Sequence, residues 1–465
     1  MNKLKIAVIG AGSTYTPELI DGFLTRYGRL DVSAFYMMDI DSRKNGIISA
    51  LARRMIAARG LSIPVVETSC LEEAITGASY VLAQVRVGQL PARVLDEKIP
   101  LKYDFIGQET TGVGGFFKAL RTLPVIENVA RIIEEKAPGA WLINFSNPSG
   151  ILAEMLNQRG NTRSIGLCNG PTGVEKLLHR KVDELTGIQD EVLGEHVDQM
   201  SGKPVKHLGA MGQESNESAC LQTMNSGNFA FDFVGLNHFN WVTDVTLGGK
   251  SIIQKLFTDK EIKGHASVQD DGFLQRIGGI PSGYLKYYYS RDKTLADSKA
   301  SKTTRGEDCM AIEEDLLKLY QDETLNTKPA LLEKRGGAFY SEAAVSLIDA
   351  IENDRNSIHV VNTPNRGAIP FLQPQDVTEV KCIVGRDGLR PLPLANPQVS
   401  LHIQGMVQML KAYEKLTIKA GLEGDYDAGL AALLTHPLLG DYERTKAVYN
   451  EMLEAHRAYL PRFFK

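Results

Sequence analysis

Short apolar runs alternate with stretches of helical periodicity through the first third of the chain. Apolar positions recur with helical spacing from Pro17, over Arg43–Arg59, over Gly115–Lys136 and from Gly150. This alternation of strands and helices predicts a doubly wound parallel sheet, a Rossmann-like α/β fold. The segments that the pattern predicts to be strands are Lys5–Ile9, Phe35–Ile40, Pro64–Thr68, Ser79–Val85, Ala140–Asn144 and Ser164–Leu167.

The pattern changes beyond residue 185. Residues 192–247 are rich in short strand-like runs, residues 250–335 show helices joined by charged loops, and residues 336–391 mix both patterns. We therefore expect a Rossmann-like domain over residues 1–185 and an α+β domain over residues 186–465, with a cleft between them. Helices are expected near the end of the chain over Leu401–Ala420, Asp425–Leu434 and Tyr442–Tyr459.

The loop after the first strand contains half of a dinucleotide-binding fingerprint. Gly10 permits a tight turn, and Gly12 lets a pyrophosphate approach the backbone and the N-terminus of the helix that begins at Pro17. The third glycine of the fingerprint is replaced by Tyr15. A short strand-to-helix turn favours glycine without any ligand, so the loop alone leaves nucleotide binding and a plain turn both open.

The end of the second strand favours the nucleotide. Asp39 stands where a carboxylate can accept hydrogen bonds from both hydroxyls of an adenosine ribose. The same carboxylate repels a 2'-phosphate, so NAD is favoured over NADP. A solvated aspartate at a strand end is the alternative.

Composition and charge exclude several classes of partner. The chain has 465 residues, 43% of them hydrophobic, which is enough for a large core. Its 52 basic and 56 acidic residues give a net charge of −4, and no basic cluster predicts nucleic-acid or membrane binding. The first residues enter a strand without the pattern of a secretory signal, and no apolar run approaches ~18 residues. We therefore expect a cytoplasmic protein. The cysteines fit a reducing compartment, since they are odd in number and lack C-x-x-C spacing: Cys70, Cys168, Cys220, Cys309 and Cys382.

Polar residues follow three of the expected strands closely. Arg86, Asn147 and the pair Cys168–Asn169 stand at the carboxyl ends of strands, where ligands gather in an open parallel sheet. Strand ends also hold polar residues simply because they are less buried.

Four chemically versatile residues lie in apolar or glycine-rich surroundings. Glu109 stands among glycines, Cys168 at a strand end, His238 in FVGLNHFNW and Tyr284 in IPSGYLKYYY. Singly, each has an ordinary explanation as a core residue. Cys168 and His238 are too far apart in sequence for a zinc finger, but they can converge on one metal whose other positions stay open for water or substrate.

The chain resembles glycoside hydrolase family 4, the NAD- and metal-dependent glycosidases, and within it the 6-phospho-β-glucosidase branch. A glycine loop with Ser13 and Tyr15 before the helix is specific to this family. The resemblance covers essentially the whole chain. The matching segments are Gly10–Leu19, Ile99–Val125, Asn144–Gly150, Leu167–Asn169, Gly235–His238, Tyr284–Tyr288, Lys334–Ala344, Val361–Ile369 and Leu433–Leu438.

The resemblance implies an elimination and addition route instead of the two-carboxylate scheme of most glycosidases. In this route NAD takes a hydride from C3 of the sugar, and the resulting ketone makes the C2 proton acidic. A base removes that proton and the group on C1 departs. Water then adds, and the hydride returns to C3, so NAD is not consumed. A sugar phosphate is the implied substrate, and the enzyme is expected to be a homodimer or homotetramer.

The resemblance also assigns residues. Cys168 and His238 hold a divalent metal, and a thiolate with an imidazole favours manganese over magnesium. Tyr284 is the base, although a phenol with a pKa near ~10 is a poor base at neutral pH unless the charge of the metal lowers that pKa. Glu109 matches a glutamate of the family that raises the basicity of this tyrosine. The cofactor contacts are Gly10, Gly12, Ser13, Thr14, Asp39 and Arg86, and the substrate contacts are Arg93, Asn147, Asn169 and Arg305.

The residue after the metal-binding cysteine distinguishes branches of the family. It is Asp in 6-phospho-α-glucosidases and His in enzymes for unphosphorylated α-glucosides, whereas here it is Asn169. An amide cannot act as a general acid, so β-linked substrates are favoured and the acid is water or another group. The following stretch, GPTGVEKLL, departs from the usual continuation, which leaves the aglycone and phosphate recognition open.

Three alternatives to a 6-phospho-β-glucosidase remain at this point. A family 4 enzyme with a galacto-configured or uronic acid glycone keeps the same site residues. An ordinary dehydrogenase of the lactate or malate dehydrogenase type shares the sheet, but it explains neither the Cys168–His238 pair nor the tyrosine motif. A non-catalytic NAD-binding sensor is opposed by the presence of every metal, base and cofactor residue.

Overall fold

The computed structural model describes residues 3–160, 163–186, 229–265, 267–268, 270–335 and 340–465, together with the short strands β7 (His196–Val197) and β8 (Pro204–Val205). Cys220 and most of the stretch expected to contain short strands lie outside these residues.

A nine-stranded sheet forms the centre of the fold, in the order β15-β14-β13-β6-β5-β4-β1-β2-β3. Its first six strands in sequence are parallel and follow the Rossmann order 3-2-1-4-5-6. The predicted doubly wound sheet is therefore confirmed. These strands are β1 (Leu4–Ile9), β2 (Val32–Met38), β3 (Val65–Thr68), β4 (Tyr80–Ala83), β5 (Trp141–Asn144) and β6 (Ser164–Gly166).

The same sheet continues into the last third of the chain. Strands β13 (Ser357–Pro364), β14 (Val377–Gly385) and β15 (Gly388–Pro391) extend it antiparallel, and Asn362 of β13 is paired with Gly166 of β6. The expected boundary at residue 185 therefore divides the chain but not the sheet. The division into two domains stays a prediction.

Both faces of the sheet are buried. In β1, Ile6 and Val8 point into a core shared with α1 (Thr16–Thr25), α2 (Ser42–Ala58) and α16 (Tyr340–Glu352), whereas Ala7 and Ile9 point into a core shared with α5 (Gly112–Lys136) and α6 (Ser149–Gln158). Successive strand side chains face opposite ways, so the uninterrupted apolar run IAVI, Ile6–Ile9, fits a strand covered on both sides.

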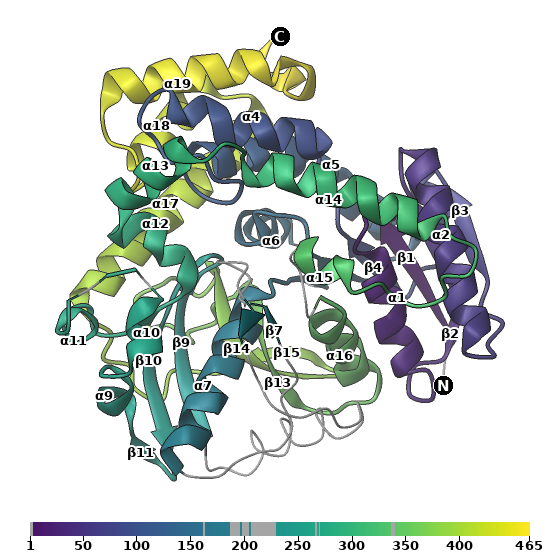
Figure 1. The fold of residues 1–465 in the computed structure, drawn as a ribbon, viewed down its shortest axis with the longest axis horizontal. Helices are drawn as coiled ribbons and strands as arrows, with labels where there is room; N and C mark the ends of the chain where they lie inside the picture. Colours follow the sequence, from purple (N-terminus) through teal and green to yellow (C-terminus); the bar gives the residue numbers. More distant parts are fainter. Residues whose placement is uncertain are drawn as a thin grey trace.

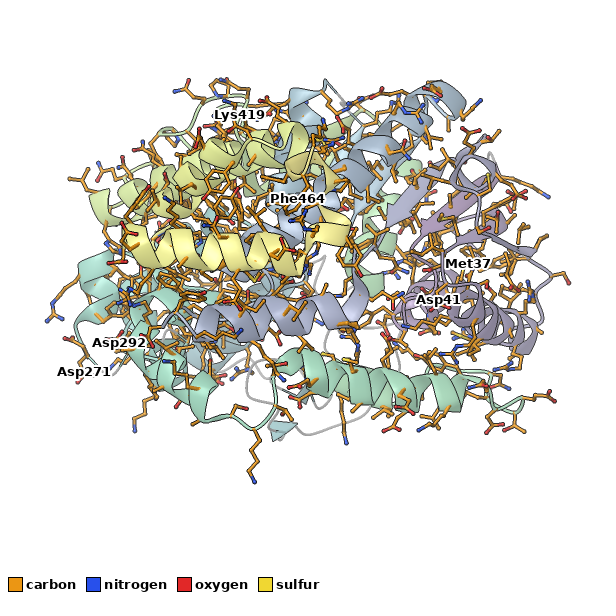
Figure 2. All side chains as sticks on the ribbon, turned by 90° about the horizontal axis from the view of Figure 1, so that it is seen from above. Met37, Asp41, Asp271, Asp292, Lys419 and Phe464 are labelled. Atoms are coloured by element: carbon orange, nitrogen blue, oxygen red, sulfur yellow. The ribbon has the colours of Figure 1, made fainter. Side chains whose placement is uncertain are left out.

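A second, smaller sheet joins β10 to β9, β11 and β12. Figure 1 shows it at the opposite end of the long axis from β2 and β3. Figure 2 shows the same separation, with Met37 and Asp41 at one end and Asp271 and Asp292 at the other. The strands of this second sheet are β9 (Phe229–Leu236), β10 (Phe239–Leu247), β11 (Lys250–Ser251) and β12 (Ile280–Pro281).

The remaining helices cover the sheets and their ends, and α4, α5, α17, α18 and α19 gather on one side of the molecule (Figure 1). Helix α4 has no clear signal in the sequence, because Pro91 and Pro100 suggest a loop. Pro91 lies in the first helical turn, where proline is tolerated. The helices are α3 (Leu71–Ile75), α4 (Gln89–Leu101), α7 (Gly170–Thr186), α9 (Ile253–Leu256), α10 (Lys260–Gly264), α11 (Phe273–Ile277), α12 (Lys286–Tyr289), α13 (Arg291–Ala300), α14 (Arg305–Tyr320), α15 (Leu331–Arg335), α17 (Leu401–Glu423), α18 (Tyr426–Thr435) and α19 (Tyr442–Ala455). Within the described ranges, no helix combines the length and apolar character needed to cross a membrane.

A capping box fixes the start of α14. The Thr304 hydroxyl accepts a hydrogen bond from the Glu307 N–H at 3.3 Å, and the Glu307 carboxylate accepts one from the Thr304 N–H at 2.9 Å. We expect Thr304→Ala to lower the free energy of unfolding by about 1 kcal/mol, because it removes the acceptor for one helix N–H. Urea denaturation measures the change, and Thr304→Ser, which keeps the hydroxyl, is the control. Equal loss in both variants would contradict the capping role.

Candidate active site

The glycine loop lies where the strand order reverses, between β1 and β4. Gly10 has φ +87°, and a Cβ there would lie 2.9 Å from the carbonyl oxygen of Gln84, so a side chain is excluded by both strain and space. The loop leads directly into α1, which begins at Thr16 with Pro17 in its first turn. The sequence therefore places a helix N-terminus at the switch point, as a dinucleotide site requires.

Asp39 anchors the glycine loop from the end of β2. Its Oδ2 accepts a hydrogen bond from the Gly12 N–H at 2.8 Å, and its Oδ1 accepts one from the Asp41 N–H at 2.8 Å. A Cβ on Gly12 would lie 2.8 Å from the same Oδ2. Burial raises the pKa of Asp39, and the two N–H donors oppose this. The carboxylate is half-buried and lies at the position expected for a ribose contact.

We expect Asp39→Ala to raise the dissociation constant for NAD about 10-fold, because it removes a charged acceptor for the ribose and loosens the loop at Gly12. Isothermal titration calorimetry with the purified protein measures this change. Asp41→Ala is the control, since the Asp41 side chain instead caps α2 by accepting a hydrogen bond from the Lys44 N–H at 3.0 Å. Unchanged NAD affinity in Asp39→Ala would rule out the ribose contact.

Tyr15, which replaces the third glycine, ties the loop to α15. Its hydroxyl donates a hydrogen bond to the Arg335 carbonyl oxygen at 3.0 Å, and the Arg335 guanidinium lies 5.3 Å from the ring centroid. Ser13 is half-buried, and its hydroxyl accepts a weak bond from the Tyr15 N–H at 3.4 Å. Thr14 is buried, and its carbonyl oxygen accepts a hydrogen bond from Tyr320 at 2.8 Å. The loop is thus held by α14 and α15 as well as by the sheet.

Three cations surround Glu109. Its carboxylate pairs with Arg86, with Arg93 Nη1 at 3.1 Å and with Lys118 Nζ at 2.9 Å. Burial alone raises the pKa of Glu109, but the three cations outweigh it and hold that pKa well below its usual range. Burial lowers the pKa of Lys118 to about 7, with Arg86 adding to the effect. The expected action of Glu109 on Tyr284 stays a prediction.

The cation cluster around Glu109, formed by Arg86, Arg93 and Lys118, has an excess of positive charge when Lys118 is protonated. Arg93 also pairs through Nε with Glu97 at 2.7 Å, so Arg86, Arg93 and Lys118 face two carboxylates. Such an excess in a partly buried site suits an anionic ligand group. Sequence reasoning did not single out Glu97 and Lys118. The signal for Lys118 is a lysine inside the apolar run GGFFKAL, which predicts a buried charge that needs a partner.

Cys168 and His238 meet, as expected from the sequence. Cys168 follows β6, and His238 lies in the two-residue turn between β9 and β10, with φ +62°. The Cys168 Sγ and His238 Nε2 atoms lie 3.4 Å apart. Sulfur and nitrogen ligands of one tetrahedral ion lie about 3.5 Å apart at ordinary bond lengths, so the pair fits a single divalent metal.

The electrostatics of this pair agree with metal binding. Burial lowers the pKa of His238 to about 3, so the imidazole is neutral, as a ligand must be. Burial raises the pKa of the Cys168 thiol to about 12, although the Gly170 N–H donates a hydrogen bond to Sγ at 3.3 Å, and a bound cation would favour the thiolate. Among the described residues, no third His, Cys, Asp or Glu joins them to complete a metal cluster. A metal held by two such side chains would offer its other positions to substrate oxygens or water.

The proposed base lies against the metal pair. The rings of Tyr284 and His238 are 4.3 Å apart between centroids, and Tyr284 lies in a short 3₁₀ turn that follows β12. The Tyr284 ring is also 6.5 Å from that of Tyr287. Cys168, His238 and Tyr284 thus come together from β6, from the β9–β10 turn and from the segment after β12.

The expected substrate residues are placed differently from one another. Asn147 is half-buried, and its Oδ1 has no hydrogen-bond partner among the described residues. Asn169 lies beside the metal pair, with its Oδ1 4.0 Å from the Cys168 Sγ. Arg305 is exposed at the start of α14, where its Nη2 donates to the carbonyl oxygens of Lys334 and Arg335 at 3.1 Å each.

Arg305 is nevertheless connected to the cation cluster. The N–H of the next residue, Gly306, donates to Glu97 Oε2 at 2.7 Å, and Glu97 pairs with Arg93. The start of α14 therefore lies beside the charged groups around Glu109.

Comparison with known proteins agrees with the geometry of the site. Residues 5–184 match the family 4 glycosyl hydrolase model, and residues 233–439 match the model of the family 4 glycosyl hydrolase C-terminal domain. The chain is 38% identical to a probable 6-phospho-beta-glucosidase of Bacillus subtilis (strain 168), and the match covers 99% of this chain and 98% of that protein.

Solved structures give the same result. The 6-phospho-beta glucosidase from Thermotoga maritima, in a structure with NAD and glucose-6-phosphate, is 32% identical with a TM-score of 0.83, covering 98% of this chain and 99% of that one. A structure of the same enzyme with manganese, NAD+ and glucose-6-phosphate has a TM-score of 0.81 at 31% identity, with the same coverage. A lactate dehydrogenase from a Medee basin deep-sea metagenome library shares the fold alone, with a TM-score of 0.50 at 14% identity over 91% of this chain and 100% of that one. The two matching family models and the full-length relatives establish that the chain belongs to glycosyl hydrolase family 4.

Proposed function

We propose that the protein is a 6-phospho-β-glucosidase that requires NAD and a divalent metal, manganese first among them. The observation that supports this proposal most directly is the close approach of Cys168 Sγ and His238 Nε2, 3.4 Å apart, with the Tyr284 ring against the imidazole. A dehydrogenase of the lactate or malate type does not explain this constellation. Relatives of the 6-phospho-β-glucosidase type span the whole chain.

The cofactor site is formed by the switch-point loop. Gly10 and Gly12 leave room for the pyrophosphate at the N-terminus of α1, and the Asp39 carboxylate accepts hydrogen bonds from the ribose hydroxyls. Ser13, Thr14 and Arg86 lie in or beside this loop and complete the cofactor contacts. When bound, NAD supplies a reversible hydride acceptor, and the divalent ion supplies Lewis acid polarisation of the sugar oxygens.

Protein side chains perform the remaining steps. Tyr284, in its phenolate form, removes the proton from C2 of the sugar and holds it at the phenol oxygen. Cys168 and His238 fix the metal next to Tyr284, and Asn147 and Asn169 orient the sugar by hydrogen bonds. Because Asn169 cannot donate a proton as an acid, the leaving oxygen is protonated by water or by another group, as expected for the β-specific branch.

The cation cluster recognises the phosphate end of the substrate. Arg93 is a substrate contact in this proposal, and Arg305 approaches from the start of α14. The excess of positive charge around Glu109 supports an anionic sugar over a neutral one. Residues 1–185 bind NAD in this scheme, and residues 186–465 supply His238, Tyr284 and the subunit contacts of a cytoplasmic homodimer or homotetramer.

Release of p-nitrophenol from p-nitrophenyl β-glucoside 6-phosphate tests the proposal. The unphosphorylated and α-linked glucosides are run beside it, each with and without NAD and manganese. We expect cleavage of the phosphorylated β-glucoside alone, dependent on both additions and without net accumulation of NADH. Full activity after removal of NAD would contradict the mechanism.

Two other outcomes separate the rivals. Cleavage of a galacto-configured or uronic acid substrate, with none of the glucoside, would keep the mechanism and change the glycone. Stoichiometric NADH formation during turnover would identify an ordinary dehydrogenase.

A further inference from the structure

The turn that contains His238 is fixed by one buried carboxylate, Glu379 of β14, which is 1% exposed. Its Oε1 accepts a hydrogen bond from Asn237 Nδ2 at 2.9 Å, and its Oε2 accepts one from Asn240 Nδ2 at 2.6 Å. These two asparagines stand on either side of His238 in the hairpin. A single side chain therefore holds both ends of the segment that presents the imidazole.

The neighbouring residue of β14 adds a third attachment. The Thr378 hydroxyl donates a hydrogen bond to the Gly235 carbonyl oxygen at 2.5 Å, in the strand that leads into the turn. His238 has φ +62°, a left-handed backbone conformation that is uncommon for residues other than glycine. Such a conformation persists where the surroundings determine it, and here β14 supplies those surroundings.

The same carboxylate is connected to the segment that contains Cys168. Asn362 Nδ2 of β13 donates to Glu379 Oε1 at 3.1 Å and to the Gly166 carbonyl oxygen at 3.3 Å. Gly166 is the last residue of β6, just before the loop with Cys168. A Cβ on Gly166 would lie 2.9 Å from the Asn362 Cβ, so a glycine is needed for this close approach.

Three amide groups thus donate to Glu379, and together they fix the position of the His238 hairpin relative to the strand before Cys168. Asn237 and Asn240 belong to the hairpin of His238, whereas Asn362 bonds the strand of Cys168. Glu379 and Cys168 are also close enough for the carboxylate charge to act on the thiol. Buried amides aimed at one carboxylate form a rigid network, because each unpaired member would remain desolvated.

We propose that Glu379 is a positioning residue that fixes the separation and orientation of Cys168 and His238 for a divalent metal. It acts through Asn237, Asn240 and Asn362 and touches neither substrate nor cofactor. This inference rests on the proposed function, which supplies the metal pair. In this proposal, the antiparallel extension of the sheet holds two metal ligands from distant parts of the chain at the separation that one ion requires.

Metal affinity of Glu379→Gln tests the proposal directly. The new amide has an N–H₂ group where the carboxylate has an acceptor oxygen, so at least one of the three amide donors loses its partner. We expect the dissociation constant for Co²⁺ to rise at least ~10-fold, as it does when groups that orient metal ligands are lost. The thiolate-to-cobalt charge-transfer absorption should weaken, and the dissociation constant for NAD should stay within twofold of the wild-type value.

A second variant and a control address loss of the fold. Asn362→Ala leaves Glu379 with two donors but cuts the connection to Gly166. We expect the dissociation constant for Co²⁺ to rise in this variant too, by a smaller factor than in Glu379→Gln. Asp349→Asn is the matched control, because Asp349 is a buried carboxylate, 4% exposed, paired with Arg29 and Arg355 away from the metal pair. Its cobalt affinity should equal that of the wild type.

The possible results separate this inference from the function on which it rests. If the wild-type protein binds cobalt through Cys168, and folded Glu379→Gln and Asn362→Ala bind it within threefold of the wild type, the positioning role is overturned and the function stands. If the wild-type protein gives no thiolate-to-cobalt absorption at all, the metal pair itself is wrong, and both proposals fail.

Discussion

Replacing Tyr284 by phenylalanine should lower kcat at least ~100-fold, the low end for removal of a general base, and should leave the NAD affinity unchanged. The phenol oxygen is the group that takes the C2 proton, and phenylalanine keeps the ring that packs 4.3 Å from His238, between centroids. The loss should therefore appear in kcat more than in KM, because the variant still binds the sugar. Steady-state kinetics on the phosphorylated β-glucoside measure the effect.

Exchange of the C2 proton gives a second readout. In D₂O, the wild-type protein should incorporate deuterium at C2 of the product, and Tyr284→Phe should do so only as slowly as it turns over. Tyr289→Phe, just after the motif, is the control, since the Tyr289 hydroxyl contacts Trp241 Nε1 at 3.1 Å and His402 Nε2 at 2.9 Å. Turnover of Tyr284→Phe at the wild-type rate would refute its role as the base.

The second large effect concerns the metal. Cys168→Ser should weaken Mn²⁺ binding at least ~100-fold, more than the loss of an outer-shell partner, because a serine hydroxyl stays protonated where a thiolate binds. Titration of Mn²⁺ followed by electron paramagnetic resonance gives the dissociation constant. Activity should return in part at high manganese concentration, since His238 and the sugar oxygens remain as ligands.

A buried cysteine outside the site serves as the control for this variant. Cys382 of β14 is fully buried, and its Sγ lies 3.7 Å from the Val380 carbonyl oxygen. Cys382→Ser should leave manganese affinity as it is, although the protein becomes less stable. If Cys168→Ser binds manganese as tightly as the wild type and is fully active, Cys168 is not a ligand.

Most of the parallel sheet could be predicted from sequence because its strands are buried on both faces. In such a strand the central residues are all apolar, as in Ile6–Ile9, and the run stands out from the amphipathic helices around it. The antiparallel extension could not be predicted in the same way. The pairing of Asn362 with Gly166 joins segments far apart in the chain, and the local sequence of neither segment predicts which strand it pairs with.

The candidate site shows the same division. Residues at strand ends or within apolar runs could be named from sequence, and Cys168, His238 and Tyr284 do come together in the structure. The residues that fix the positions of these three side chains could not be named from sequence, because the role of Glu379 depends on contacts with Asn237 and Asn362, which are distant in the chain. The contacts of Tyr15, a departure from the dinucleotide fingerprint, are likewise seen only in the structure, where its hydroxyl donates to the Arg335 carbonyl oxygen and its ring packs against the Arg335 guanidinium.

The extension of the sheet by β13–β15 also affects synthesis and folding. During translation, the parallel half of the sheet leaves the ribosome with the far edge of β6 unpaired until β13 follows almost two hundred residues later. Contacts of such long sequence separation form slowly, and an exposed strand edge invites pairing with other chains. The hydrogen bonds between Glu379 and the turn of His238 need β14, so we expect the metal pair to reach its final geometry late in synthesis.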